Sequence, residues 1–193
     1  MNKLGQTPSQ TVGPYFAYGL TPEQYKFDHT SLATPVLLDA RKNSQDAIIL
    51  RGKVCDLHGE AVDDAMIEIW QVDQEGKFQI KPHQGFFSIG RMGTGTIEGN
   101  LFEFTTCIPA AEKPGQAPAI HMIVFMRGLL SHVYTRVYFE DFKELNQEDP
   151  YLKLVAEERR STLIAQKVQE SPVTIYEFNL HMQGENETVF FDY

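Results

Sequence analysis

The stretch AIHMIVFM, residues 119–126, is the clearest indication of a sheet-based fold. It is a nearly continuous apolar run of strand length, which is typical of a central strand buried in a sheet. One histidine, His121, interrupts the run, and Arg127 and Gly128 follow it directly. The stretch therefore predicts a central strand that carries one imidazole and ends at a guanidinium group.

Further strands are predicted on both sides of this stretch. Residues 101–109 (LFEFTTCIP) and 132–141 (HVYTRVYFED) alternate between apolar and polar side chains, the period of half-buried strands. Other apolar segments with strand character are 47–56, 66–73, 174–184 and 187–193. We expect the strands at 47–56 and 66–73 to form a hairpin or the opening of a sandwich. Many short strands at short spacing predict a mainly β protein, a single antiparallel β-sandwich domain over residues 1–193.

Two segments depart from the strand pattern. Residues 1–45 hold prolines, glycines and aromatic side chains without a helical or strand period, which predicts an irregular arm. Aromatic side chains in such an arm need a surface to bury against, and we expect the arm to pack on a partner chain. Residues 143–168 predict one late α-helix, with Asp149-Pro150 as its start. Its apolar face would hold Leu152, Val155, Leu163 and Ile164.

Composition excludes several classes of function. A formal net charge of -9 and a pI of about 5.1 disfavour nucleic acid and anionic lipid as partners. Two isolated cysteines indicate reduced core residues rather than a disulfide framework. No apolar run reaches the roughly 18 residues of a membrane span, and residues 1–20 lack a signal-peptide pattern. We therefore expect a cytoplasmic protein.

Searching for catalytic motifs leaves one side chain of interest. The six histidines form no compact metal-binding pair, and the serines lack a G-x-S-x-G motif. Adjacent Asp63 and Asp64 are typical of a solvated turn. Arg127 allows two interpretations, a solvated strand end or a guanidinium at a pocket rim that binds a carboxylate. The residues by themselves do not choose between them.

Three segments together resemble one family. TPSQTVGPYFAYGL (7–20), MIEIWQVDQEGKF (66–78) and MQGENETVFFDY (182–193), with FMRG and YTRVYFED between them, are similar to intradiol ring-cleavage dioxygenases. The likeness is greatest to the alpha chains of those that act on protocatechuate (3,4-dihydroxybenzoate). It implies a β-sandwich assembled as alpha–beta pairs in a larger oligomer. It also implies that O₂ and Fe(III) open the ring between the two hydroxylated carbons, giving 3-carboxy-cis,cis-muconate.

The resemblance also implies that this chain binds no iron. The family holds Fe(III) with two tyrosines and two histidines of the beta chain. At the matching positions this chain has Phe78, Ala119 and His121, and the loop 107–116 contains no tyrosine. Phenylalanine and alanine offer no donor atom, so a hard ferric ion would not be held firmly. We expect the isolated chain to be inactive, the iron to lie in the partner beta chain, and His121 to be an ordinary strand histidine.

The chain still has residues at the positions that line the family's substrate pocket. The resemblance assigns these roles to Thr11, Gly13, Pro14, Tyr15 and Arg127. Two alternatives stay open. One is a purely structural or stabilising β-sandwich subunit, and the other is a stand-alone transthyretin-like binding module.

Overall fold

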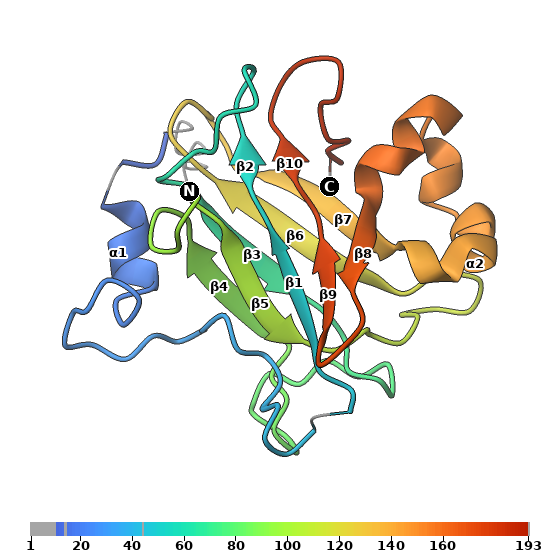
Figure 1. Cartoon of the computed structure of the whole chain (residues 1–193), viewed down its shortest axis with the longest axis horizontal. Helices are drawn as coiled ribbons and strands as arrows, with labels where there is room; N and C mark the ends of the chain where they lie inside the picture. Colours follow the sequence, from blue (N-terminus) through green and yellow to red (C-terminus); the bar gives the residue numbers. More distant parts are fainter. Residues whose placement is uncertain (1–10, 14, 44, 193) are drawn as a thin grey trace, which may run out of the picture.

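The structure is a computed structural model that describes residues 11–13, 15–43 and 45–192. Figure 1 shows that strands dominate this part of the chain. The strands are β1 (Ile48–Gly52), β2 (Val54–Cys55), β3 (Met66–Trp70), β4 (Ile89–Gly93), β5 (Phe102–Thr106), β6 (Ala119–Phe125), β7 (Val133–Phe139), β8 (Ile164–Gln169), β9 (Thr174–Glu177) and β10 (Leu180–His181). The α-helices are α1 (Phe16–Leu20) and α2 (Lys143–Glu148), and 3₁₀ segments lie at Glu140–Phe142, Leu152–Leu154 and Glu157–Leu163.

The strands confirm the mainly β prediction but form a mixed sheet. Their order is β4-β3-β6-β7-β8-β9-β1-β5, with β10 and β2 paired separately. The predicted β-sandwich class is confirmed, but the expected antiparallel direction is wrong at three pairs, because β1 with β9, β7 with β8 and β10 with β2 run parallel. Alternation of side chains reports which face of a strand is buried, not the direction of its neighbour. Parallel pairs need long crossover connections, and residues 140–163 provide the one between β7 and β8.

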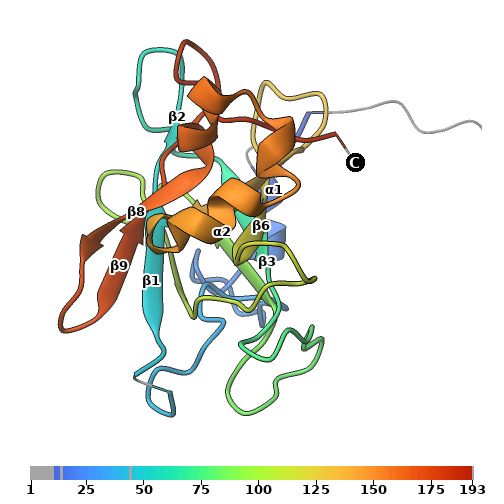
Figure 2. The ribbon, with the colours of Figure 1, turned by 90° about the vertical axis from the view of Figure 1, so that its right-hand side faces the viewer.

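The central stretch lies where its pattern predicts. In β6, Ile120, Met122 and Val124 are fully buried and point into the main core. From the opposite layer, Leu50 of β1 and Phe104 of β5 join the same core. Figure 2 shows these layers from the side, with β1, β8 and β9 on one side and β3 and β6 on the other. The other face of β6, which carries Ala119 and His121, is therefore left outside the main core.

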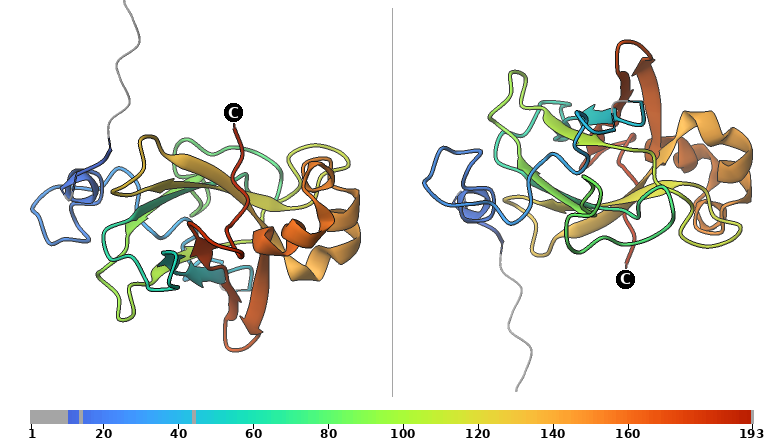
Figure 3. Two further views of the ribbon diagram at one scale, coloured as in Figure 1. Left: turned by 90° about the horizontal axis from the view of Figure 1, so that it is seen from above. Right: turned by 90° about the horizontal axis from the view of Figure 1, so that it is seen from below.

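The prediction of one long late helix is wrong. The helix α2 ends at Glu148, before the expected start at Asp149-Pro150, and short 3₁₀ segments lead into β8. The apolar side chains nevertheless share one face, because Leu152, Val155 and Leu163 form a small second core with Ala117, Ala119 and Tyr138, and Ile164 packs against it. Figure 3 shows these helical segments and α1 at opposite ends of the strands.

Asp149 explains why the backbone turns here. Its side chain is fully buried and accepts hydrogen bonds from the backbone N–H groups of Tyr151 and Leu152 at 2.9 and 3.0 Å. It also accepts one from Ala117 N–H and one from the Tyr138 hydroxyl, both at 3.0 Å. These last two donors come from outside the segment, so a tertiary contact, not helix propensity, determines its course.

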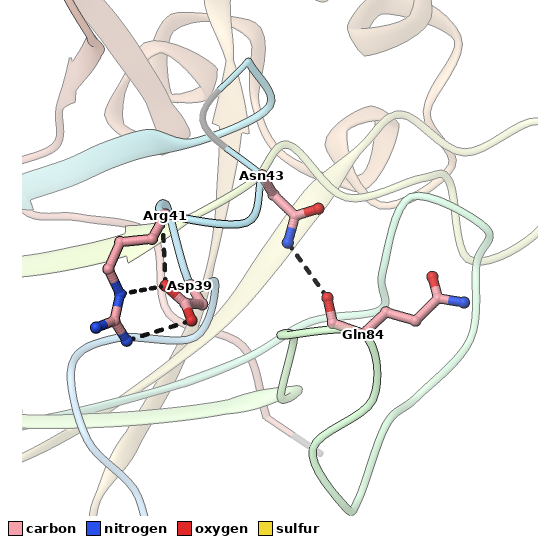
Figure 4. A network of polar contacts seen from close by, with 4 residues as sticks. All are labelled: Asp39, Arg41, Asn43 and Gln84. Atoms are coloured by element: carbon pink, nitrogen blue, oxygen red, sulfur yellow. Dashed lines mark hydrogen bonds and ion pairs between the residues drawn. The ribbon is translucent and has the colours of Figure 1, made fainter.

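The described part of the N-terminal arm is more ordered than the irregular segment expected, since it contains α1. Leu37 and Leu38 join the main core of this chain, and Leu37 N–H donates to the Thr105 carbonyl at 2.8 Å. Nearby, Asn43 donates to the Gln84 carbonyl at 3.2 Å and so links the arm to a distant loop (Figure 4). The expected packing of the arm on a partner chain stays a prediction.

One smaller expectation is corrected, and the structure chooses between two alternatives for another. The segment 187–193 is not a strand over its described residues, and only an isolated bridge joins Phe191 to Tyr134. The strands at 47–56 and 66–73 open the sandwich instead of forming a hairpin, because β3 pairs with β4 and β6. No helix in the described ranges is long and apolar enough to cross a membrane.

Candidate functional site

The turn after β6 places Arg127 beside the turn that precedes β3. The Arg127 side chain is 60% exposed, whereas that of its partner Asp64 is only 20% exposed. The Arg127 Nε group donates to the Asp64 carboxylate. Gly128 follows with a positive φ of 90°, a backbone conformation that glycine adopts without strain. Arg127 is therefore not a freely solvated strand end, because its guanidinium is bound on one side and open on the other.

The N-terminal arm reaches the same turn. The Thr11 hydroxyl accepts a hydrogen bond from Gly128 N–H at 3.2 Å, across a sequence separation of 117 residues. The ring of Phe16 in α1 packs on Phe125 at the end of β6, with 5.4 Å between centroids. A cavity of about 250 Å³ lies here, lined by Val12, Phe16, Phe125, Met126, Leu129, Leu130, Ser131 and His132. The structure thus brings Thr11 and the Arg127 turn together, and their role in a substrate pocket stays a prediction.

The other arm residues assigned to the pocket are placed less closely. The Gly13 carbonyl accepts from Phe16 N–H at 3.0 Å and so begins the turn into α1. Tyr15 is 77% exposed, and its ring meets Tyr18 edge-on with 5.7 Å between centroids. Pro14 lies outside the described residues. No contact between Tyr15 and Arg127 is found in the described structure, and their joint role in a pocket stays a prediction.

The arm lies near the Asp64 turn, because the Tyr25 hydroxyl donates to the carbonyl of Thr94 at 3.3 Å, and Thr94 is hydrogen-bonded to Ala65. Tyr18 packs on Tyr25 with 4.4 Å between ring centroids. Burial raises the pKa of Tyr25, and the nearby Tyr18, Asp64 and Asp63 groups raise it further. Tyr25 therefore stays neutral and presents a phenol, not a second charge, to the acidic turn.

The family likeness aligns three positions with a metal site, namely Phe78, Ala119 and His121, and these differ in burial and surroundings. Phe78 follows the Asp73–Lys77 turn and is 46% exposed. Ala119 is buried in the small second core, and His121 lies two residues further along β6 on the same face. In the part of the chain that the structure describes, no group of three His, Cys, Asp or Glu side chains is arranged to hold a metal ion. Neither Phe78 nor Ala119 has a side-chain atom that could coordinate a metal ion.

His121 has a specific partner that the sequence did not reveal. Its Nε2 atom lies 2.5 Å from Oε1 of Glu112, in the loop 107–116. The hydrogen bond from His121 lowers the pKa of the Glu112 carboxyl against the opposing effect of burial, and Arg136 and Lys113 lower it further. The contact ties the loop to the sheet, so His121 has a structural role beyond that of an ordinary strand histidine. Nothing in the spacing of the two residues could have predicted the pair.

Charged side chains on this face of the sheet are paired although they are nearly buried. Glu68 is 6% exposed; it accepts from Arg91 at 2.5 Å and from the Trp70 indole at 2.6 Å. The Arg136 guanidinium lies 3.7 Å from the centre of the Tyr151 ring, a cation–π contact. Neither group is predictable from the strand pattern, because that pattern treats a charged residue as solvent-facing.

Comparisons with known proteins agree with this fold. A family model described as "Dioxygenase" matches residues 12–184. The chain is 45% identical to the protocatechuate 3,4-dioxygenase alpha chain of Burkholderia cepacia, over 100% of both chains. It is 28% identical to the beta chain from that organism, over 78% of this chain and 71% of the other. The solved intradiol ring-cleavage dioxygenase of Tetranychus urticae has a TM-score of 0.57 at 18% identity, covering 92% and 94% of the two chains, and supports the fold alone.

These matches show that the chain belongs to the intradiol dioxygenase family. Within that family, the full-length likeness is to a protocatechuate 3,4-dioxygenase alpha chain. The family expectation from sequence is thereby confirmed.

Proposed function

We propose that this chain is the alpha subunit of an Fe(III)-dependent enzyme that cleaves protocatechuate with O₂ to 3-carboxy-cis,cis-muconate. The full-length likeness to an alpha chain supports the assignment, and the likeness to a beta chain supports a partner of that kind. The observation in the structure that carries a pocket role is the contact of the Thr11 hydroxyl with the Arg127 turn. It joins the two segments to which the family likeness assigns substrate binding.

We place the iron in the partner beta chain. Two of the matching positions, Phe78 and Ala119, have no donor atom, and the Nε2 atom of His121 is engaged by Glu112. A hard ferric ion prefers anionic oxygen and imidazole donors in a complete set. This chain would then supply substrate binding and assembly while the partner supplies the metal, and the chain alone would be inactive.

Arg127 would attract and orient the substrate. Protocatechuate carries a carboxylate, whereas this chain has a net charge of -9, so an anion needs a local positive group. An exposed guanidinium provides that charge and two parallel N–H donors. Thr11, Gly13, Pro14 and Tyr15 would form the neighbouring wall of the pocket.

The test is co-expression with a beta chain, measuring O₂-dependent ring cleavage and iron content. We expect ferric iron and activity in the pair and neither in this chain alone, together with the visible colour of tyrosinate bound to iron. Arg127→Ala in the pair should raise KM for protocatechuate by roughly ten- to a hundredfold, the loss of a charge-assisted pair of hydrogen bonds. Stoichiometric iron in the lone chain would contradict the division of labour.

A matched control separates this role from a general charge effect. Arg41 is also an exposed arginine whose Nε group pairs with an aspartate, Asp39, at 3.0 Å (Figure 4). Arg41→Ala removes the same charge without touching the Arg127 turn and should leave KM unchanged. An unchanged KM for Arg127→Ala would instead favour the alternative of a stabilising subunit. A beta chain that is fully active without this chain would favour the same alternative.

A further inference from the structure

The Asp64 carboxylate lies beside the Arg127 guanidinium, which the proposed function needs for binding the substrate. Arg127 is assigned to an anionic substrate, yet Asp64 already binds its Nε group. Two roles are possible for Asp64. It either competes with the substrate for the guanidinium, or it holds the guanidinium in place for the substrate.

The geometry of the guanidinium favours the second role. The group has two edges that present paired N–H donors, one containing Nε and the other formed by the two terminal nitrogens. Asp64 takes the Nε side, and among the described residues no further hydrogen bond or ion pair is found for Arg127. The terminal edge therefore stays open for a second carboxylate, and the 60% exposure of the Arg127 side chain leaves it accessible.

The support beneath Asp64 is rigid. The next residue, Ala65, is bound on both sides to Thr94: its N–H donates to the Thr94 hydroxyl at 3.0 Å, and its carbonyl accepts from Thr94 N–H at 2.8 Å. The neighbouring Asp63 carbonyl packs so closely on Gly95 that a Cβ there would lie 2.2 Å from it. A side chain on this turn therefore has little backbone freedom.

The support on the other side of the contact is also defined. Gly128 N–H is bound to the Thr11 hydroxyl at 3.2 Å, and Leu129 N–H closes the turn onto the Met126 carbonyl at 3.4 Å. Arg127 is thus a flexible side chain on a held turn, and Asp64 is the contact that restricts its rotamers. Holding a rotamer-rich side chain before binding removes an ordering cost that the ligand would otherwise meet.

We propose that Asp64 is a positioning residue: it binds the Nε side of Arg127 and so presents the terminal edge of the guanidinium to the substrate carboxylate. This inference rests on the proposed function of Arg127. Asp64 does not touch the substrate, and its effect is confined to ligands that carry a carboxylate.

The test uses the co-expressed alpha–beta complex and compares protocatechuate with catechol, which lacks the carboxylate. Asp64→Ala should raise KM for protocatechuate about fivefold, the effect of one side chain that must be ordered on binding, with kcat unchanged. KM for catechol should not change. Asp64→Asn keeps an acceptor for the Nε group and should restore KM to within about twofold of the unmodified complex. The matched control Asp63→Ala removes an adjacent carboxylate that makes no contact with Arg127 in the described structure, and should leave KM unchanged.

The outcomes distinguish this inference from the proposed function. If Arg127→Ala raises KM but Asp64→Ala leaves it unchanged, Asp64 has no effect on binding, and if Asp64→Ala lowers KM, Asp64 is a competing charge. Either result overturns the positioning role. If Arg127→Ala itself leaves KM unchanged, the proposed role of Arg127 fails. If both single variants raise KM, the double variant should have the same KM as Arg127→Ala alone, because Asp64 acts only through the Arg127 side chain. Should Asp64→Ala not assemble, Asp64→Glu displaces the acceptor while keeping its charge, and an unchanged KM there also overturns the proposal.

Discussion

The buried carboxylate of Asp149 offers a sharp test of what holds the segment after β7 in place. It accepts four hydrogen bonds of 2.9–3.0 Å, from Tyr151 N–H, Leu152 N–H, Ala117 N–H and the Tyr138 hydroxyl. Leu152, Ala117 and Tyr138 are buried residues, so Asp149→Ala leaves three buried donors without this acceptor. An unsatisfied buried donor costs about 1–3 kcal/mol, and water entering the vacated space offsets part of that. We therefore expect a loss of about 3–5 kcal/mol in the free energy of unfolding.

The assay is thermal unfolding of the complex and of the chain alone, where the chain can be prepared. For a chain of this size, 1 kcal/mol corresponds to roughly 2–4 °C, so Tm should fall by about 6–20 °C. The matched control is Glu148→Ala, the preceding carboxylate, which lies 75% exposed beside Lys153 and should leave Tm nearly unchanged. A Tm for Asp149→Ala within about 2 °C of the unmodified protein would refute the reasoning, since the four bonds would then be replaceable by water.

Three further predictions concern other parts of the chain. Gly52→Ala should lower the free energy of unfolding by about 3 kcal/mol or more, because the added Cβ would lie 1.8 Å from the Phe178 carbonyl oxygen. Gly19→Ala has open space around the added Cβ and should be neutral or stabilising, so equal unfolding midpoints for the two variants would disprove this prediction. The pKa of Glu112 is lowered in the folded state, so its contribution to folding stability is present above the unfolded pKa of about 4.5 and is lost as pH falls through the folded pKa. Glu112→Gln should therefore lose less stability than the unmodified protein between pH 6 and pH 3. Parallel curves of unfolding free energy against pH would count against the Glu112–His121 pair. Burial raises the pKa of the Cys107 thiol to about 12, so a thiol-specific reagent at pH 8 should label it only after unfolding, and rapid labelling of the native chain would contradict its burial.

Strand patterns anticipated much of the fold because burial alternates along a strand. Residues 119–126, 132–141 and 101–109 contain β6, β7 and β5, and the segment 174–184 contains β9 and β10, with alternate residues Tyr176, Phe178 and Leu180 buried. The long late helix failed for a different reason. Its apolar spacing was real, but the same side chains reach the same small core through 3₁₀ segments once Asp149 is anchored to the neighbouring strands.

The candidate site divides in the same way. Arg127 was recognised as a guanidinium at a strand end, and the family likeness added Thr11 and its neighbours. The partners Asp64 of Arg127 and Glu112 of His121 could not be anticipated, since neither pair has a local spacing signal. The family likeness assigns Thr11 and Arg127 to one pocket, but it does not give the hydrogen bond from Gly128 N–H to the Thr11 hydroxyl. The sequence predicts that Asp64 lies in a solvated turn, where adjacent carboxylates usually occur, whereas in the structure it binds Arg127.

The strand faces, the family, and the lack of donor atoms in Phe78 and Ala119 follow from the amino-acid sequence alone. These are properties of side-chain chemistry and of short-range periodicity, and they need no knowledge of distant neighbours. Knowledge of the three-dimensional fold is needed for three other features: the strand directions, the course of the chain after Asp149, and the partners of Arg127 and His121. Those features depend on contacts between residues far apart in the chain, where a buried charge or donor takes whichever partner the fold brings within reach.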